Sequence, residues 1–141
     1  MDVGTIAAGS TPVRLESAAA CAMLAAAAAA APDEACGLLF GEAAHIREAS
    51  IAANRSPTPA SRFEIDPAHL FDAQRRHRAG PERLVGCWHS HPNGNGCPSR
   101  QDREGVADMG WLWLIVADGR IHAWRPTPAG FEAVAIAGGS L

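Results

Sequence analysis

The sequence predicts a single α/β (α+β) domain in which a β-sheet is flanked by helices. Three observations support this: short apolar runs bounded by glycine or proline alternate with helical segments, the pair Asp118-Gly119 joins two of these runs as a hairpin turn does, and the chain has 141 residues. A chain of this length can bury a core without disulfides, and it is small for two domains. We therefore expect one domain over residues 11–138, preceded by a flexible N-terminus at 1–10.

The first half of the chain is predicted to contain four strands and two helices. Strands are expected at residues 12–15, 36–41, 45–51 and 62–66, and a loop is expected at 54–61. Ser17 is a suitable N-cap for an alanine-rich helix, which Pro32 ends after residue 31. Pro67 opens a second helix that runs to about His77. The alanine-rich helix carries almost no charge and lets a neighbour approach closely, so we expect it to lie against the sheet.

The second half is predicted to begin with a buried strand at Leu84-Val85-Gly86 and to end in a sheet. A short helix is expected at residues 100–109, and further strands are expected at 111–116, 120–124 and 131–136. The order of these elements contains no internal repeat and no linker long enough to separate two domains. A single sheet with a few helices is therefore the expected framework for any site.

Two histidines stand at alternate positions of the strand that begins at Leu84. Successive side chains of a strand point to opposite faces, so His89 and His91 leave the sheet on the same side. After a turn rich in Pro, Gly and Asn, Ser99 and Asp102 have the spacing of a first helical turn, which allows Asp102 to return as a third ligand. Two imidazoles and one carboxylate, with no fourth ligand near in sequence, describe an open metal site of the catalytic kind.

At these residues the sequence resembles the JAB/MPN family of zinc metallopeptidases, also called JAMM proteases. One matching motif is His-x-His-Pro at 89–92, followed after six residues by Ser99-x-x-Asp102. The other is the segment Pro32–Gly41, which carries Glu34. The resemblance covers nearly the whole chain, and neither motif departs from the family pattern.

The resemblance implies both a fold and a set of residue roles. The fold is a mixed, mostly antiparallel sheet flanked by helices, with the zinc site between a strand and a helix. By resemblance, His89, His91 and Asp102 bind one Zn²⁺. Glu34 is then the general acid/base, and Ser99 assists at the oxyanion.

The roles of Glu34 and Ser99 have alternatives, and three other residues have to be weighed against the site. On residue type alone Asp33 is as good a candidate as Glu34, and only the resemblance favours Glu34. Ser99 can serve as the cap of the following helix as well as an oxyanion donor. Cys97 lies between the two halves of the metal motif, but we expect it to pack under the loop because three ligands already complete a catalytic set. His122 alternates with apolar residues and is expected to be a surface or packing residue.

The resemblance also implies a substrate class. Small bacterial members of the family resemble enzymes that trim the C-terminal tail of ubiquitin-like sulfur-carrier proteins, so a peptidase or isopeptidase of that kind is expected, and a homodimer is left open. Two alternatives remain: a RadC-like protein associated with DNA repair, whose His-x-His-Pro-x-Gly is similar to residues 89–94, and a non-catalytic MPN interaction module. The basic run Arg75–Arg78 is either a solvated helix end or a docking site for substrate.

Composition argues against several other partners. A net charge of −3 and a pI near 6.0 provide no concentrated basic face for nucleic acid. The alanine-rich run lacks the positive start of a secretory signal, and no run reaches the roughly 18 apolar residues that a membrane-spanning helix needs. Four cysteines without CxxC spacing favour reduced thiols, so we expect a cytoplasmic location and no membrane partner.

Overall fold

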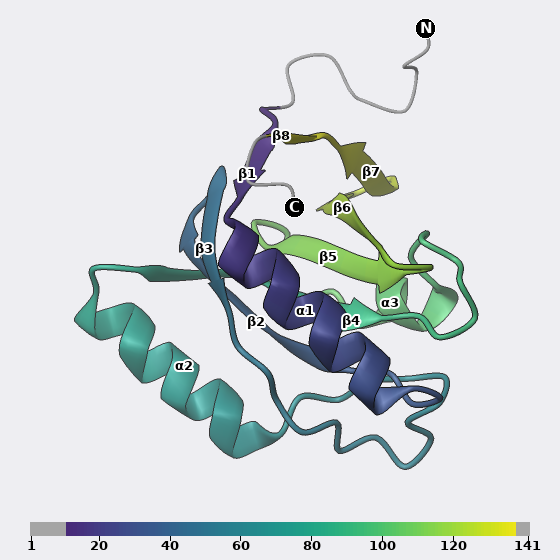
Figure 1. The fold of residues 1–141 in the computed structure, drawn as a ribbon. Helices are drawn as coiled ribbons and strands as arrows, with labels where there is room; N and C mark the ends of the chain where they lie inside the picture. Colours follow the sequence, from purple (N-terminus) through teal and green to yellow (C-terminus); the bar gives the residue numbers. More distant parts are fainter. Residues whose placement is uncertain (1–10, 138–141) are drawn as a thin grey trace, which may run out of the picture.

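The computed structural model describes residues 11–137 (Figure 1). The expected flexible segment 1–10, and residue 138 of the expected domain, lie outside the described residues. The helices are α1 (Ser17–Ala30), α2 (Pro67–Ala79) and α3 (Arg100–Glu104). The strands are β1 (Val13–Leu15), β2 (Cys36–Glu42), β3 (His45–Ala49), β4 (Arg83–Ser90), β5 (Leu112–Ala117), β6 (Arg120–Thr127), β7 (Gly130–Val134) and β8 (Ile136–Ala137).

The strands in residues 11–137 form one mixed sheet, in the order β7-β6-β5-β4-β2-β3-β1-β8. The pairs β2·β3, β2·β4, β5·β6 and β6·β7 are antiparallel, while β4·β5, β1·β3 and β1·β8 are parallel. Asp118 and Gly119 both have positive φ (55° and 72°), which a two-residue hairpin turn of type I′ requires. The expected hairpin between β5 and β6 and the mixed, mostly antiparallel sheet are both confirmed.

Helix α1 covers one face of the sheet (Figure 1), and its contacts explain why it is built of small residues. Ala19, Ala20 and Met23 are buried in the core cluster that this helix shares with apolar side chains of β1 to β6. Met23 is fully buried, which contributes roughly 1.5–3 kcal/mol to folding. The expected packing of the alanine-rich helix on the sheet is therefore confirmed.

The opposite face carries a second core cluster, which includes the aromatic side chains near the site. Leu38, Phe40 and Cys87 point to this face and pack with Trp113 and with Ala73 of α2. The alternation along β4 places His89 on the same face as Cys87. The site residues therefore stand on the side of the sheet away from α1.

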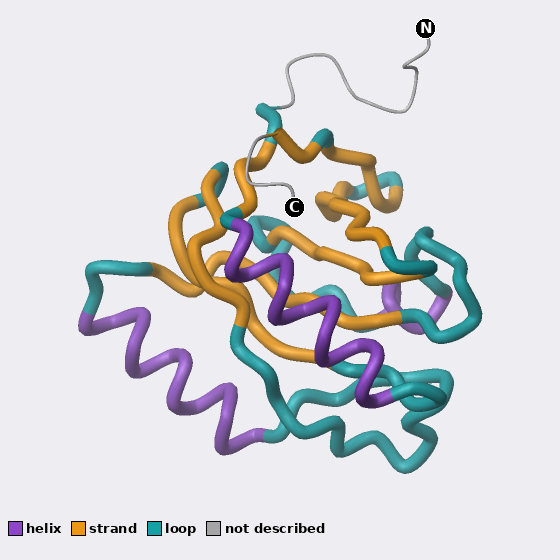
Figure 2. The backbone as a smooth tube through the Cα atoms, viewed as in Figure 1, coloured by secondary structure: helices purple, strands orange, loops and turns teal. Residues whose placement is uncertain are grey.

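Two predicted elements differ from expectation: one strand does not form, and one helix is shorter. Residues 62–66 do not form a strand: the segment makes one isolated bridge, between Ile65 and Asn54, and is otherwise held within a long loop by the Arg62 N–H, which donates to the Thr58 carbonyl, and by the Asn54 side chain (Figure 2). The helix expected at 100–109 ends at Glu104, because Gly105 follows as the C-cap and its N–H closes the last turn. The loops on both sides of the site are thus longer than the sequence pattern indicated.

Two further boundaries differ from expectation. The single strand expected at 131–136 is divided into β7 and β8 at Ala135, whose carbonyl accepts the N–H of Val13 at 2.9 Å as the chain crosses to pair with β1. Ser17 is the first residue of α1, and the N-cap is Glu16. Within the described residues no helix is long and apolar enough to span a membrane.

Candidate metal centre

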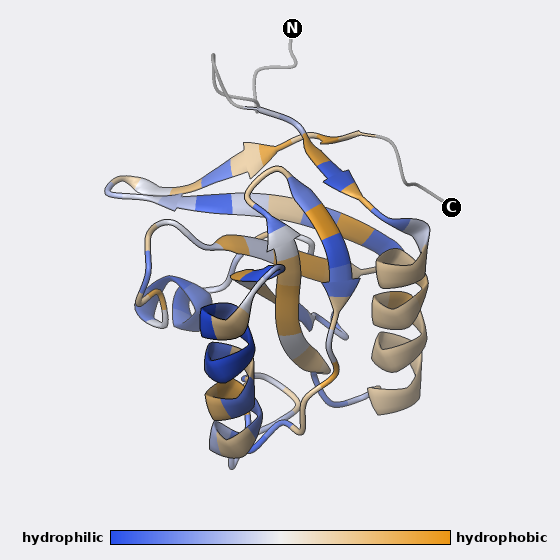
Figure 3. Ribbon diagram, turned by 90° about the vertical axis from the view of Figure 1, so that its left-hand side faces the viewer, coloured by the Kyte–Doolittle hydropathy of each residue, from blue (hydrophilic) through white to orange (hydrophobic). Residues whose placement is uncertain are grey.

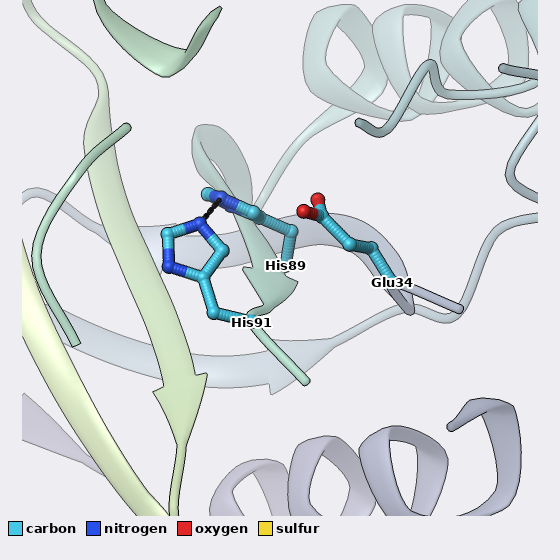
Figure 4. Close-up of side chains that lie close together, drawn as sticks. All are labelled: Glu34, His89 and His91. Atoms are coloured by element: carbon cyan, nitrogen blue, oxygen red, sulfur yellow. Dashed lines mark hydrogen bonds between the residues drawn. The ribbon is translucent and has the colours of Figure 1, made fainter. Parts of the chain in front are cut away.

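The register of the sheet brings the two motifs together. Cys36 of β2 pairs with His89 of β4 in an antiparallel ladder. Continuing that register by two residues places Glu34 opposite His91, just beyond the ends of both strands. Figure 4 shows the result: the Glu34 carboxylate extends toward the two imidazoles.

Three side-chain atoms converge on one point. His89 Nε2 lies 3.0 Å from His91 Nε2, and Asp102 Oδ2 lies 3.1 Å from each of these nitrogens. All three side chains are buried. Ligand atoms that bind zinc tetrahedrally at about 2.0–2.1 Å lie about 3.3 Å from one another, so this triangle has nearly the size of a zinc coordination face.

Asp102 is held at this point by the helix that it helps to begin. Ser99 Oγ accepts the N–H of Asp102 at 3.0 Å, and the Ser99 N–H donates to Asp102 Oδ2 at 2.8 Å, which is a capping box. Ser99 therefore caps α3. Its hydroxyl oxygen accepts in this contact, so its hydrogen is available to a further acceptor.

The two imidazoles are oriented differently. His91 Nδ1 donates to the carbonyl of Asn95 at 2.7 Å, which leaves the Nε2 lone pair directed at the site. The ring of His89 stacks on Phe63 at 4.3 Å and meets Trp113 edge-on at 5.9 Å. Its Nδ1 is buried and has no hydrogen-bond partner in the described part of the chain. An aromatic wall thus fixes one ring, and a backbone hydrogen bond fixes the other.

Glu34 is buried beside the triangle. Its Oε1 has no hydrogen-bond partner among residues 11–137, and only 6 % of the residue is exposed. Glu34, His89 and His91 can each offer one metal-ligand atom within 4.8 Å of the others. Asp102 Oδ2 lies 3.1 Å from both Nε2 atoms, so Asp102 is a further candidate ligand and Glu34 lies beside it.

The electrostatics separate the two carboxylates. Burial raises the pKa of Glu34 to about 7, with the charge of His91 opposing this and that of Asp102 adding to it. Burial also opposes ionisation of Asp102, but its hydrogen bonds with His89 and His91 outweigh that effect and lower its pKa well below the ordinary range. One carboxylate is thus kept as an anion, while the other is poised to exchange a proton near neutral pH.

The histidines show a similar division. Burial lowers the pKa of His89 despite its contact with Asp102. Burial acts in the same direction on His91, but the hydrogen bonds to Asp102 and to the Asn95 carbonyl are stronger and raise its pKa. Binding of a metal ion by these two rings would require both Nε2 atoms to be deprotonated.

The backbone at Glu34 is fixed by residues that sequence reasoning did not single out. The Glu34 N–H donates to the carbonyl of Pro59 at 2.8 Å, and the next N–H, that of Ala35, donates to Ser90 Oγ at 2.8 Å. Asn54 Nδ2 donates to the Glu34 carbonyl at 3.0 Å. Strand alternation could have shown that the Ser90 side chain points to the face opposite His89 and His91. Asn54 lies in a loop, and no sequence pattern marks it.

Asn54 links Glu34 to the opposite rim of the site. Its Nδ2 also donates to the carbonyl of Arg62 at 3.0 Å, and its Oδ1 accepts the N–H groups of Ser56 and Glu64, both at 3.0 Å. The loop between β3 and α2 is therefore organised by one amide side chain. This bonding holds residues 62–64 beside the metal centre without a regular strand.

Other candidate residues lie outside the cluster. Asp33 is partly exposed and is not one of the three residues that group around the imidazoles. Cys97 is exposed, so the expectation that it packs under the loop is wrong; its N–H donates to Asn95 Oδ1, which holds the loop in a turn. His122 packs against the backbone of Gly96, where a Cβ would approach its ring to 2.6 Å. Its packing role agrees with the expectation.

A cavity of about 530 Å³ opens beside Asp102. Its lining includes residues 62–65 of the loop around Phe63, the indoles of Trp111 and Trp113, and Gln101 of α3. Asp102 is the residue of the site that lines this cavity, whose volume has room for an extended peptide segment.

Comparison with known sequences finds a family and relatives. The family described as prokaryotic homologs of the JAB domain matches residues 16–127. A desampylase of Haloferax volcanii is 32% identical over 109 residues, which is 75% of this chain and 78% of the relative. A desampylase of Pyrococcus furiosus is 34% identical over 92 residues, covering 64% of this chain and 65% of the relative.

Solved structures give the same result for the fold. The solution structure of a Desulfitobacterium hafniense protein matches with a TM-score of 0.79 and 25% identity, over 92% of this chain and 94% of the other. The crystal structure of a JAB1/MPN domain protein from Archaeoglobus fulgidus matches with a TM-score of 0.57 and 19% identity, over 89% and 96% of the two chains. The second likeness shows the fold alone.

Proposed function

The chain belongs to the JAB/MPN (JAMM) family and is a hydrolase of that type, and from this premise we propose that it is a zinc-dependent peptidase or isopeptidase acting on the C-terminal tail of a ubiquitin-like sulfur-carrier protein. The observation that carries the proposal is the convergence of His89, His91 and Asp102 beside a buried Glu34 with no hydrogen bond at Oε1.

Zinc fits the residues that are present. His89, His91 and Asp102 would hold it, because two imidazole nitrogens and one carboxylate oxygen form a triangle of the right size in a buried place. With three protein ligands a fourth position stays open to water, as catalytic zinc sites require. A zinc ion bound there would acidify water and polarise the scissile carbonyl.

Glu34 is the proposed general acid/base. Its pKa of about 7 suits a group that takes a proton from the attacking water and returns it to the leaving amine at neutral pH. Its Oε1, which forms no hydrogen bond within the described residues, is available for that proton. Ser99 is proposed to donate its hydroxyl hydrogen to the tetrahedral oxyanion while its oxygen continues to cap α3.

The substrate class is supported from two sides. Two relatives at 32% and 34% identity are named desampylases, which favours a ubiquitin-like protein as the substrate. The cavity beside Asp102 has room for an extended tail, and its walls of Phe63 and Trp111 would cover a tail of small residues closely. A cytoplasmic location agrees with four free cysteines and stays a prediction.

The test is hydrolysis of defined tails. The zinc-loaded protein is incubated with ubiquitin-like sulfur-carrier proteins whose C-termini are extended by a few residues, and the released peptide is identified by mass. We expect release by the wild type and none by Glu34→Gln or by the metal-stripped protein. If no tail is cleaved while duplex DNA binds measurably, the proposal is wrong and the RadC-like alternative gains support.

A further inference from the structure

A second hollow, here called the basic groove, lies between the end of α2 and the start of β4. Its volume is about 460 Å³, and its lining includes His77, Arg78, Arg83, Asp108 and Trp111. Figure 3 shows that the C-terminal turns of α2 are the most hydrophilic part of that helix. Nothing in the proposed chemistry uses this groove.

The basic run at the end of α2 divides into paired and unpaired arginines. Arg75 forms an ion pair with Asp72 at 2.9 Å. Arg76 binds Glu48 at 2.6 Å and Glu82 at 3.2 Å, so its charge is balanced within the fold. Arg75 is thus paired within α2, whereas Arg76 links α2 to Glu48 of β3 and to Glu82, so neither guanidinium is left without an acidic partner.

Arg78 and Arg83 are different. Both are exposed, and among residues 11–137 neither guanidinium has a hydrogen bond or an ion pair. The acidic group in the groove, Asp108, uses Oδ1 to accept the N–H of Gly110 in a turn. Two unneutralised guanidinium groups therefore face one hollow, and such groups bind carboxylates in a bidentate manner.

The basic groove adjoins the cavity beside Asp102. Asp108 and Trp111 line both hollows. If the tail of a substrate protein occupies the cavity and reaches Asp102, the folded part of that protein would lie close to Trp111. Its surface would then lie over Arg78 and Arg83.

We propose that the basic groove docks an acidic face of the ubiquitin-like protein whose tail is cleaved. The inference rests on the proposed function, since it takes the tail to lie in the adjacent cavity. Charged contacts at the rim of an interface mainly direct encounter and select partners, so Arg78 and Arg83 determine which carrier protein is used. A nucleic acid is disfavoured, because two free arginines on a chain of net charge −3 offer few phosphate contacts.

The experiment compares a folded substrate with its isolated tail. Arg78→Glu, Arg83→Glu and the double variant are assayed on a tail-extended sulfur-carrier protein of acidic surface and on a synthetic peptide of the tail alone. The charge-matched control is Arg14→Glu/Arg120→Glu, two exposed arginines that line neither hollow. Binding of the fluorescently labelled carrier is measured in parallel, at low and at high salt.

We expect each reversal in the groove to raise KM for the folded carrier about five- to tenfold, to leave kcat and peptide hydrolysis unchanged, and to lose its effect at high salt. The control variant should behave as the wild type. Equal losses on carrier and peptide, or on groove and control variants, overturn the docking role. Tight binding of duplex DNA that depends on Arg78 and Arg83 and displaces the carrier overturns it as well.

The binding measurement separates this inference from the proposed function. If the carrier binds in an arginine- and salt-dependent way but no tail is cleaved, the groove is supported and the hydrolytic assignment fails. If tails are cleaved but carrier binding ignores both arginines, the hydrolytic assignment stands and the groove proposal fails.

Discussion

Replacing Glu34 by Gln in the metal-free protein should increase stability, and the increase should depend on pH. The native structure holds the Glu34 carboxyl in a buried position where Oε1 accepts no hydrogen bond from any described residue, so ionisation is costly. Glutamine has nearly the same shape and cannot ionise. Comparison of the two proteins therefore isolates the cost of one buried charge.

The sign and the size follow from the pKa. Burial raises the pKa of Glu34 from the ordinary 4.5 to about 7, so the native state holds this proton more tightly than the unfolded state does. The corresponding stability is fully present below pH 4.5 and is lost as pH rises through 7. A difference of that size corresponds to about 3 kcal/mol at pH 8, and the Gln variant avoids the loss.

The assay is urea unfolding in the presence of a chelator, for both proteins, between pH 4 and pH 8. At pH 4 the free energies of unfolding should differ only by the effect of replacing a protonated carboxyl with an amide. At pH 8 the difference should be larger by about 3 kcal/mol in favour of the Gln variant. Asp33→Asn, which removes a neighbouring and partly exposed carboxylate, is the control. A pH-independent difference for Glu34→Gln would show that this carboxyl is hydrated or paired in the native state, and the argument for it as a poised acid/base would fail.

Three further predictions concern the site. Glu34→Gln should retain zinc but lose hydrolysis, whereas His91→Ala and Asp102→Ala should lose both; equal metal loss in all three, measured by elemental analysis, would show that Glu34 is a ligand. Ser99→Ala should keep its metal, lose about 1 kcal/mol of stability with the cap of α3, and hydrolyse substrate far more slowly. If the variant is only less stable and its folded fraction hydrolyses substrate normally, Ser99 is a capping residue and nothing more. Asn54→Ala should lower the free energy of unfolding by about 2–4 kcal/mol, because four hydrogen bonds are lost. Asn54→Asp keeps the two bonds that Oδ1 accepts, so it should recover part of the stability but not kcat. Equal kcat in both variants and the wild type would refute a positioning role.

Local sequence patterns were sufficient for most of the secondary structure. Alanine propensity and Pro32 define α1, and Asp118-Gly119 defines the hairpin between β5 and β6, because these signals act within a few residues. The patterns failed where tertiary contacts compete with propensity. Residues 62–66 have a strand-like composition but are held in a loop, in part by Asn54. Ala135 interrupts a strand because its carbonyl accepts the N–H of Val13 in β1.

The sequence by itself was enough to predict that His89, His91 and Asp102 meet, because strand alternation and a helix cap are local devices that act within a short span. Only the tertiary structure decided the rest. Glu34 reaches the triangle through the register of β2 against β4, and its raised pKa is caused by burial, which no linear pattern records. The separation of paired from unpaired arginines at the end of α2 has the same origin, since charge in a sequence becomes a free charge only when folding supplies no partner.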